Sequence, residues 1–304
     1  MIIKRMDSKQ KEIAELTVLL KSNLTPYERF LVERELKALR TGVRGEKDSA
    51  YHIDFYFGNS KNWAVIHDLR IEHKLQVAQI DHLLINRFYD VYVLESKNYS
   101  YKIQITAEGE FQVHDGRQYF GIESPIEQNK RHIHLLDPFL KDPEILPKRM
   151  GISIRPRFKN FVLVSPKSII VRPPEKKFDT SCVIKADTLR TRIDMEVDKQ
   201  TPLDNVVTLS KFFSSSTLGE TVKRLASFHK QLRVYYAAKF HLPIQGPTIL
   251  QGERILKHGE SKNVSKYFCS RCNKAISEKV AKFCLENNER FGGKTYCFDC
   301  QKSF

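Results

Sequence analysis

Two segments of the chain place ionisable residues inside otherwise apolar runs. Asp81 interrupts the first run, and Glu95 and Lys97 interrupt the next one. A buried, unpaired carboxylate is costly, so such strands need a compensating partner. If the two runs form a tight hairpin, Asp81 lies opposite Glu95, with Cβ atoms about 4.5–5.5 Å apart. Two like charges at that distance repel unless one is protonated or a divalent cation lies between them, and oxygen ligands suit Mg²⁺ or Mn²⁺.

This interpretation depends on the register of the hairpin. Glu95 and Lys97 are two residues apart, so they project from one face of their strand. A slip of one residue would move Asp81 to the opposite face of the sheet. The alternative is therefore an amphipathic strand on which Asp81 and a Glu95–Lys97 pair simply face solvent.

A second group that could bind metal lies near the end of the chain. Two C-x-x-C motifs, Cys269–Cys272 and Cys297–Cys300, are separated by 24 residues. Paired knuckles of this kind predict a structural zinc site with four thiolate ligands. Cys284 lies between the knuckles, where it is either a spare thiol or a replacement for one ligand. The isolated Cys182 is expected to be a small buried apolar residue. Basic and aromatic residues alternate around the knuckles, which favours contact with nucleic acid, while a protein partner for the zinc module is the alternative.

The segments that must position these groups alternate between helical and extended patterns. Capping signals and apolar periodicity predict the following elements: helices at 26–39, 45–57, 125–140 and 217–239, strands at 63–71, 77–85, 91–97 and 158–164, and a hairpin over 102–113 that turns at Glu108-Gly109. Residues 171–210 give no clear assignment.

The order of these elements predicts an α/β fold with several parts. The predicted parts are an N-terminal helical segment at 1–40, a compact α/β core at 41–170, a basic mixed and helical extension at 171–242, a linker at 243–266 and a zinc ribbon at 267–304.

Four short motifs occur in one order across the predicted core. They are Gly45-Glu46, Gln79-Ile80-Asp81-His82, Leu94-Glu95-Ser96-Lys97-Asn98-Tyr99 and Ser124-Pro125-Ile126-Glu127-Gln128-Asn129. This set resembles the PD-(D/E)xK nuclease superfamily and, more closely, the nuclease-related (NERD) domain family. The resemblance covers about residues 41–140. It implies a restriction-endonuclease-like core, a mixed sheet flanked by helices, that hydrolyses phosphodiester bonds with a divalent metal.

The resemblance also implies roles for individual residues. Asp81 and Glu95 would bind Mg²⁺ or Mn²⁺, and Glu46 would bind the metal directly or through water. Lys97 would position or help deprotonate the attacking water, and Gln128 would orient Lys97 or a phosphate oxygen. Two plainer interpretations stay open: Glu46 as a carboxylate near a helix N-terminus, and Gln128 as a solvated helix residue. Ser124-Pro125 departs from the Asn-Pro of many relatives, at a position outside the implied chemistry.

The net charge of +15 indicates a polyanionic partner, either nucleic acid or an anionic membrane surface. The distribution of this charge along the chain helps to distinguish the two. Residues 41–140 carry 11 basic and 14 acidic side chains, whereas residues 141–250 carry 20 and 10. Basic flanks around an acidic core favour nucleic acid, with DNA expected, over a membrane surface. No apolar run approaches the ~18 residues of a membrane span, and the expected compartment is the cytoplasm. The alternative function is a catalytically inactive adaptor that binds nucleic acid or protein on the same core.

Overall fold

A computed structural model describes residues 1–99, 101–149, 152–198, 212–240, 242, 267–272 and 274–302. The chain divides into two compact units. The first unit comprises residues 1–14 and 33–233, and the second comprises residues 15–32 and 234–304. The predicted linker at 243–266 lies outside the described residues.

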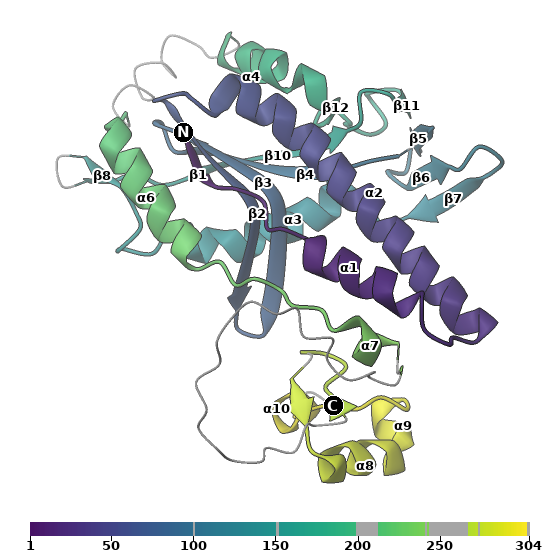
Figure 1. Cartoon of the computed structure of the whole chain (residues 1–304). Helices are drawn as coiled ribbons and strands as arrows, with labels where there is room; N and C mark the ends of the chain where they lie inside the picture. The colour runs from purple at the N-terminus through teal and green to yellow at the C-terminus, as the bar shows by residue number, and fades with distance from the viewer. Residues whose placement is uncertain are drawn as a thin grey trace. The chain divides into compact units, whose positions relative to one another are not determined.

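The first unit is built on a six-stranded mixed sheet (Figure 1). Its strands lie in the order β1 (Ile2–Lys4), β2 (Trp63–His73), β3 (Gln76–Asn86), β4 (Asp90–Lys97), β10 (Arg157–Val164) and β12 (Val183–Lys185). The β2–β3–β4 meander is antiparallel, and the remaining neighbours are parallel. The predicted α/β class, a mixed sheet with helices against it, is confirmed.

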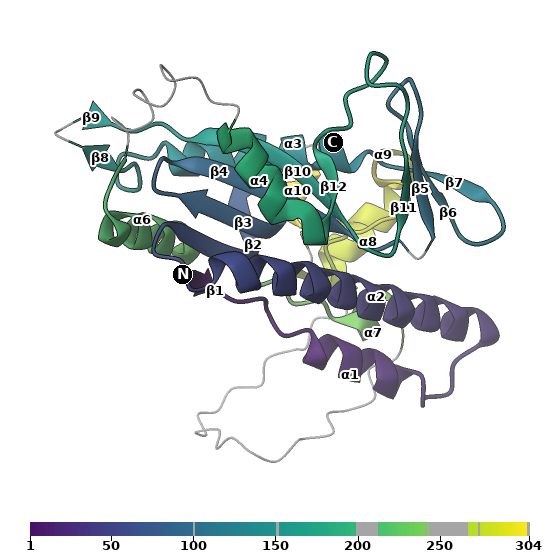
Figure 2. The ribbon, with the colours of Figure 1, turned by 90° about the horizontal axis from the view of Figure 1, so that it is seen from above.

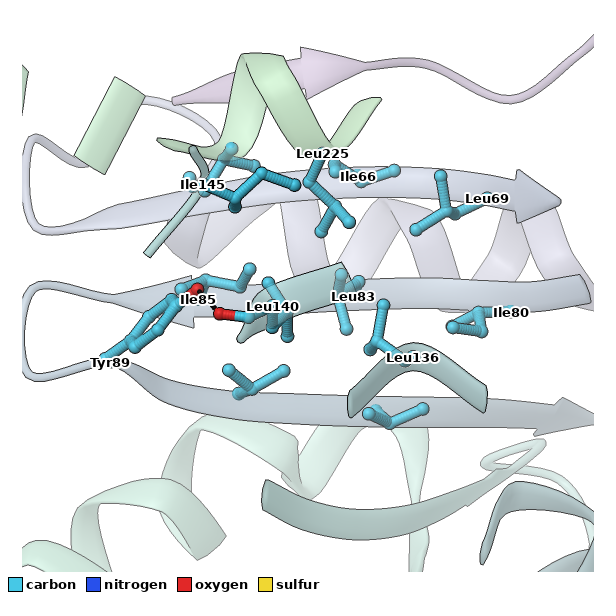
Figure 3. Close-up of a cluster of buried hydrophobic side chains, with 14 of the residues drawn as sticks. Ile66, Leu69, Ile80, Leu83, Ile85, Tyr89, Leu136, Leu140, Ile145 and Leu225 are labelled. Atoms are coloured by element: carbon cyan, nitrogen blue, oxygen red, sulfur yellow. Dashed lines mark hydrogen bonds between the residues drawn. The ribbon is translucent and has the colours of Figure 1, made fainter. Parts of the chain in front are cut away.

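Helices cover both faces of this sheet (Figure 2). α3 (Pro125–Leu140) and α6 (Ser215–Ser227) pack on one face, which we call the α3 face. Figure 3 shows this core, where the Tyr89 hydroxyl donates a hydrogen bond to the Leu140 carbonyl at 3.0 Å. α2 (Pro26–Phe57) and α4 (Leu189–Asp198) pack on the other face, the α2 face, through Ile53, Phe57 and Ile193. Burial of both apolar faces holds the sheet between two helical layers.

A smaller four-stranded sheet follows the meander. Its order is β11 (Ile169–Val171), β5 (Lys102–Ile105), β6 (Phe111–His114) and β7 (Tyr119–Ile122). The predicted hairpin at 102–113 is confirmed, and Gly109 adopts a positive φ of 84° at its turn, where a residue without a Cβ is favoured. A separate short hairpin joins β8 (Lys148–Arg149) to β9 (Ile152–Ser153).

The predicted helix break at residues 40–44 is wrong. The Thr25–Glu28 capping box forms as expected, with the Thr25 backbone N–H donating to Glu28 at 2.8 Å. From there α2 runs through both Gly42 and Gly45 to Phe57 without interruption. Each glycine costs a helix about 1 kcal/mol relative to alanine. Gly45 is buried, and the absence of a side chain there lets the helix pack closely against Asn98. This packing offsets the cost of the glycine.

Three further differences from the sequence expectations concern the ends of the core. Residues 2–4 form an edge strand rather than part of a helical segment. Residues 183–198 form β12, a short 3₁₀ turn (Ala186–Thr188) and α4. The sheet therefore extends beyond residues 41–170 on both sides. The helix expected from 217 to 239 instead begins after the Ser214 cap and ends at Ser227. Phe228 caps the end of this helix, and beyond it the Lys230 backbone N–H donates to the Arg70 carbonyl of β2.

The second unit contains the cysteine motifs. β13 (Tyr267–Phe268) pairs with β14 (Ala275–Ile276), and α8 (Glu278–Glu286), α9 (Asn288–Phe291) and α10 (Phe298–Gln301) follow. The parts of α1 (Gln10–Leu19) and α2 at residues 15–32 also belong to this unit, together with α7 (Tyr236–Lys239), whose first N–H groups donate to Glu15. No helix among the described residues combines the length and apolarity that crossing a bilayer requires.

Candidate active site and metal centre

The β3–β4 hairpin splits at the residues expected to do chemistry. Its pairing runs from Ile85 opposite Val91 to His82 opposite Leu94 and stops there. Extended by one residue, this register would place Asp81 opposite Glu95, the arrangement expected from the sequence, but the two residues do not pair. Beyond the split, the Asp81 carboxylate accepts the Ser96 backbone N–H at 2.8 Å. A side chain thus replaces the next backbone partner, which holds Asp81 in the gap between the two strands.

Glu95 and Lys97 project from β4 toward α3. The Lys97 ammonium donates to Glu95 at 2.8 Å and to the Gln128 side-chain carbonyl at 3.0 Å. Gln128 lies on α3, whose N-terminus is fixed by the Ser124 side chain accepting the Glu127 N–H. Next to it, Asn129 is fully buried and donates to the Val93 carbonyl of β4 at 2.7 Å. α3 is therefore tied to β4 at the level of Lys97, and two acceptors fix the position of the ammonium.

Glu46 reaches the same place from the opposite face. It lies on α2, and burial together with the charges of Asp68 and Glu95 raises its pKa to about 7, although Lys9 and Lys97 act against this rise. Burial, Glu95 and Glu46 likewise raise the pKa of Asp81 well above its ordinary value. The pKa of Glu95 is also raised, mainly by burial. The structure brings the five sequence-predicted residues, Glu46, Asp81, Glu95, Lys97 and Gln128, to one site.

Sequence reasoning missed one acidic neighbour, Asp68 on β2. It is buried, it accepts the Gln79 side-chain amide at 3.0 Å, and it has a left-handed φ of 54°. Around it the alternation of the strand fails, since His67 points to Asp54 on the α2 face and Leu69 joins the core of the α3 face. The register of β2 and β3 places Asp68 at the level of Asp81. Strand-like sequence alone carries no signal for such a bend.

Histidines also surround the cluster without joining it. His67 and His82 contact each other through Nδ1 atoms 2.8 Å apart, and burial lowers the pKa of both. The Nδ1 atom of His132 lies 3.6 Å from Glu95, and burial lowers the pKa of His132 to about 4. Because burial disfavours the charged form of His132, the cation that contacts Glu95 directly is Lys97.

The carboxylate cluster has the donor chemistry for a divalent cation. The Oε2 atom of Glu95 is buried and accepts no hydrogen bond within 3.5 Å from any described residue, and the Nδ1 atom of His132 lies 3.6 Å from it. Buried polar atoms are normally satisfied, and an unsatisfied carboxylate oxygen beside two further carboxylates fits a hard cation. Among the described residues, only four thiols, discussed below, lie close enough together to share one ion in the present side-chain positions. Mg²⁺ usually keeps several waters, which would bridge the wider spacing of the carboxylates.

Gly45 controls how closely α2 approaches this site. A Cβ atom at Gly45 would lie 2.4 Å from the Cβ of Asn98, the residue after Lys97. The Asn98 side chain also donates to the Thr41 carbonyl of α2 at 3.2 Å. The absence of a side chain at Gly45 therefore allows the contact that carries Glu46 toward Asp81.

We expect Gly45→Ala to destabilise the first unit by about 1–3 kcal/mol and to reduce any activity of the cluster, because α2 must move away from Asn98. Gly42→Ala is the matched control, since its added Cβ meets only Glu46 Oε1 at 3.9 Å, and it should gain about 0.5–1 kcal/mol of helix stability. Denaturation followed by fluorescence of Trp63, the single tryptophan, measures both. Equal effects of the two substitutions would contradict the packing argument.

The four knuckle cysteines form a second, separate candidate centre. The ligand atoms of Cys269, Cys272, Cys297 and Cys300 all lie within 4.8 Å of one another. Burial raises the pKa of the Cys269 thiol, but backbone N–H groups of Cys272, Cys297 and Arg271 outweigh this and lower it to about 7. This compact set of four thiols is compatible with the tetrahedral zinc site expected from the sequence.

Cys284 lies outside this group of four. Its sulfur accepts the Tyr296 N–H at 3.3 Å and the Gln301 amide at 3.2 Å, and its thiol contacts the Tyr296 carbonyl. These contacts, together with complete burial in the small core of the module, agree with the interpretation of Cys284 as the spare thiol. Cys182 is half-buried beside an apolar cluster rather than fully buried.

A mixed sheet between helices, with carboxylates and a lysine at a split hairpin, is the arrangement that the resemblance to the nuclease-related domain family implies. The family comparison agrees, because residues 41–171 match the model described as nuclease-related domain (NERD). The chain therefore contains a nuclease-related domain, and the four clustered cysteines are compatible with a zinc ribbon. Neither the curated proteins nor the solved structures give a significant match to the chain.

Proposed function

We propose that the first unit is a metal-dependent nuclease that hydrolyses phosphodiester bonds, with DNA as the substrate. The observation that carries this proposal is the unsatisfied Oε2 of Glu95, within a cluster of carboxylates and beside a fixed lysine. The family match supports a nuclease-like domain in the same residues. The catalytic roles given below to Glu46, Asp81, Glu95, Lys97 and Gln128 are part of the proposal.

In this mechanism Asp81 and Glu95 hold the cation, and Glu46 completes the site directly or through water. A bound Mg²⁺ or Mn²⁺ supplies an activated water and stabilises negative charge on the phosphate. The Lys97 ammonium stays next to that position, because it donates hydrogen bonds to Glu95 and Gln128. It orients the attacking water and neutralises charge that develops on the phosphoryl oxygens. Gln128 is a positioning residue that acts through Lys97.

The flanking charge supports a nucleic-acid substrate. The segment at 141–250 carries the largest basic excess of the chain, and basic residues flank and separate the cysteine knuckles in the sequence: Lys266, Arg271, Lys274, Lys279, Lys282, Arg290 and Lys294. Basic surfaces of this kind bind phosphate backbones and release counterions. We propose that the zinc module assists binding in this way, with a protein partner as the other use of the same module.

A cleavage assay tests the function directly. With Mg²⁺ or Mn²⁺ the protein should cut plasmid, linear or single-stranded DNA, and a chelator should stop cutting. Lys97→Met should slow cleavage by about 100-fold or more, the scale of losing one stabilising donor. Lys102→Met, at the exposed first residue of β5, is the charge-matched control and should cut normally.

Two outcomes would exclude the enzyme. DNA and RNA left uncut under all metal conditions, combined with salt-dependent binding, would favour the inactive nucleic-acid-binding alternative. The absence of both cutting and binding would favour a protein-interaction adaptor.

A further inference from the structure

A pocket of about 600 Å³ lies beside the proposed catalytic site and has no role in the chemistry described above. Its walls are α2, the residues after β4 and the turn after β10. Asn98 in this wall directly follows Lys97, and Ser165 in the turn donates its backbone N–H to the Lys97 carbonyl at 3.2 Å. The pocket therefore continues from the end of the strand that carries Glu95 and Lys97. Its volume lies within the usual range for small-ligand sites, about 300–1,000 Å³.

The charged lining of the pocket is mainly cationic. Arg40 and Arg44 project from successive turns of α2, and Lys167 enters from the turn after β10, against a single carboxylate from Asp48. In the part of the chain that the structure describes, no carboxylate lies within 4.0 Å of the charged groups of Arg40, Arg44 or Lys167. Cations that are not neutralised by the protein are available to phosphate oxygens.

An exposed aromatic side chain adjoins these cations. Tyr51 lines the pocket and is 65% exposed, and Phe55, one turn further along α2, is 71% exposed. Their ring centroids lie 6.4 Å apart. Large exposed rings beside cations match the surfaces on which unpaired bases stack while the backbone phosphates are held.

We propose that this pocket binds a single unpaired nucleotide of the substrate strand, next to the bond that is cut. Its phosphate lies against Arg40, Arg44 and Lys167, and its base stacks on Tyr51. Because a base within a duplex cannot present its face to Tyr51, the pocket selects single-stranded DNA or frayed ends over paired DNA. This inference rests on the proposed nuclease function and names the form of substrate that the site accepts.

Binding of a fluorescein-labelled single-stranded oligonucleotide and of its duplex, followed by anisotropy with Ca²⁺ in place of Mg²⁺, tests the pocket. Tyr51→Ala should weaken single-strand binding by about fivefold or more and duplex binding by less than about twofold. The double variant Arg40→Ala/Lys167→Ala should weaken single-strand binding by about tenfold and reduce the slope of log Kd against log salt by about one to two.

Matched controls lie on the same helix. Lys47→Ala and Tyr56→Ala remove an exposed cation and an exposed ring that do not line the pocket, and both should bind like the unsubstituted protein. Unchanged binding by the pocket variants would overturn the proposal, and so would equal losses for duplex and single strand or equal losses in the controls.

The binding readout also separates this inference from the proposed function. Selective loss of single-strand binding in a protein that cuts nothing would retain the pocket and reject the nuclease. Cleavage with unchanged binding in the pocket variants would retain the nuclease and reject the pocket. Trp63 fluorescence confirms that each variant is folded.

Discussion

Replacing Asp81 with asparagine is expected to abolish cleavage and, at the same time, to make the metal-free protein more stable at pH 8. The loss of activity follows from the proposed role of Asp81 as a metal ligand. Substituting a residue that only supports a metal ligand lowers metal affinity or activity by about 10–100-fold. Losing a ligand should therefore lower activity by at least about 100-fold. Asparagine keeps an oxygen that can accept the Ser96 N–H, so the local hydrogen bond survives.

The gain in stability follows from the charges around Asp81. Burial, Glu95 and Glu46 raise the pKa of Asp81, which means that the charged form of the cluster is disfavoured in the folded protein. Removing one charge should therefore stabilise the metal-free first unit by about 1–2 kcal/mol, the scale of relieving one incompletely paired buried polar group. For a unit of this size the melting temperature, measured by Trp63 fluorescence, should rise by about 2–8 °C.

The effect should depend on pH with a definite sign. A carboxyl group whose pKa is raised on folding contributes stability that is present below its unfolded pKa and lost as pH rises through its folded pKa. Because the pKa of Glu46 is raised to about 7 and that of Asp81 is also raised, metal-free protein should lose this contribution as pH rises from about 5 to 8. The advantage of Asp81→Asn should therefore be large at pH 8 and small at pH 5.

Adding metal should reverse the order of stability of the unsubstituted protein and Asp81→Asn. Mg²⁺ or Mn²⁺ at pH 8 should raise the melting temperature of the unsubstituted protein and have little effect on Asp81→Asn. The control is Asp187→Asn, an exposed aspartate away from the cluster, which should change neither activity nor the response to metal. Normal cleavage by Asp81→Asn, or a normal thermal shift with metal, would contradict the assignment of Asp81 as a ligand.

Much of this site could be predicted from the sequence because the relevant interactions are local. The turn between β3 and β4 is short, and the apolar alternation from Leu83 to Leu94 on either side of it determines the register of the hairpin. Ser124-Pro125 determines where α3 begins, and this start positions Gln128 relative to Lys97. Two C-x-x-C motifs likewise define their own turns.

The parts that could not be predicted depend on contacts between distant segments. Gly42 and Gly45 weaken a helix locally, yet α2 continues because Gly45 packs against Asn98, 53 positions further along the chain. Asp68 joins the acidic neighbourhood only because its backbone adopts a left-handed conformation opposite Asp81. The pocket beside the site combines α2 with two strand ends. Tertiary packing decides each of these features, and propensity does not.

The largest expected effect on folding concerns the cysteine module. Removing zinc, by a strong chelator or by Cys297→Ser, should unfold residues 267–302 while leaving the first unit folded. The core of the module is small and includes the candidate ligands Cys269, Cys297 and Cys300 themselves. Structural zinc contributes about 10–16 kcal/mol of apparent binding free energy in comparable peptides at pH 7, so such a module does not fold without metal.

Zinc analysis combined with limited proteolysis measures this effect. The purified protein should contain about one zinc per chain, and Cys297→Ser should lose the metal and become sensitive to protease after residue 267. Trp63 lies in the first unit, so its unfolding transition should be unchanged. Cys284→Ser is the matched control, because serine oxygen can still accept the Tyr296 N–H, and this variant should retain zinc. Loss of zinc from Cys284→Ser together with its retention in Cys297→Ser would instead place Cys284 in the ligand set.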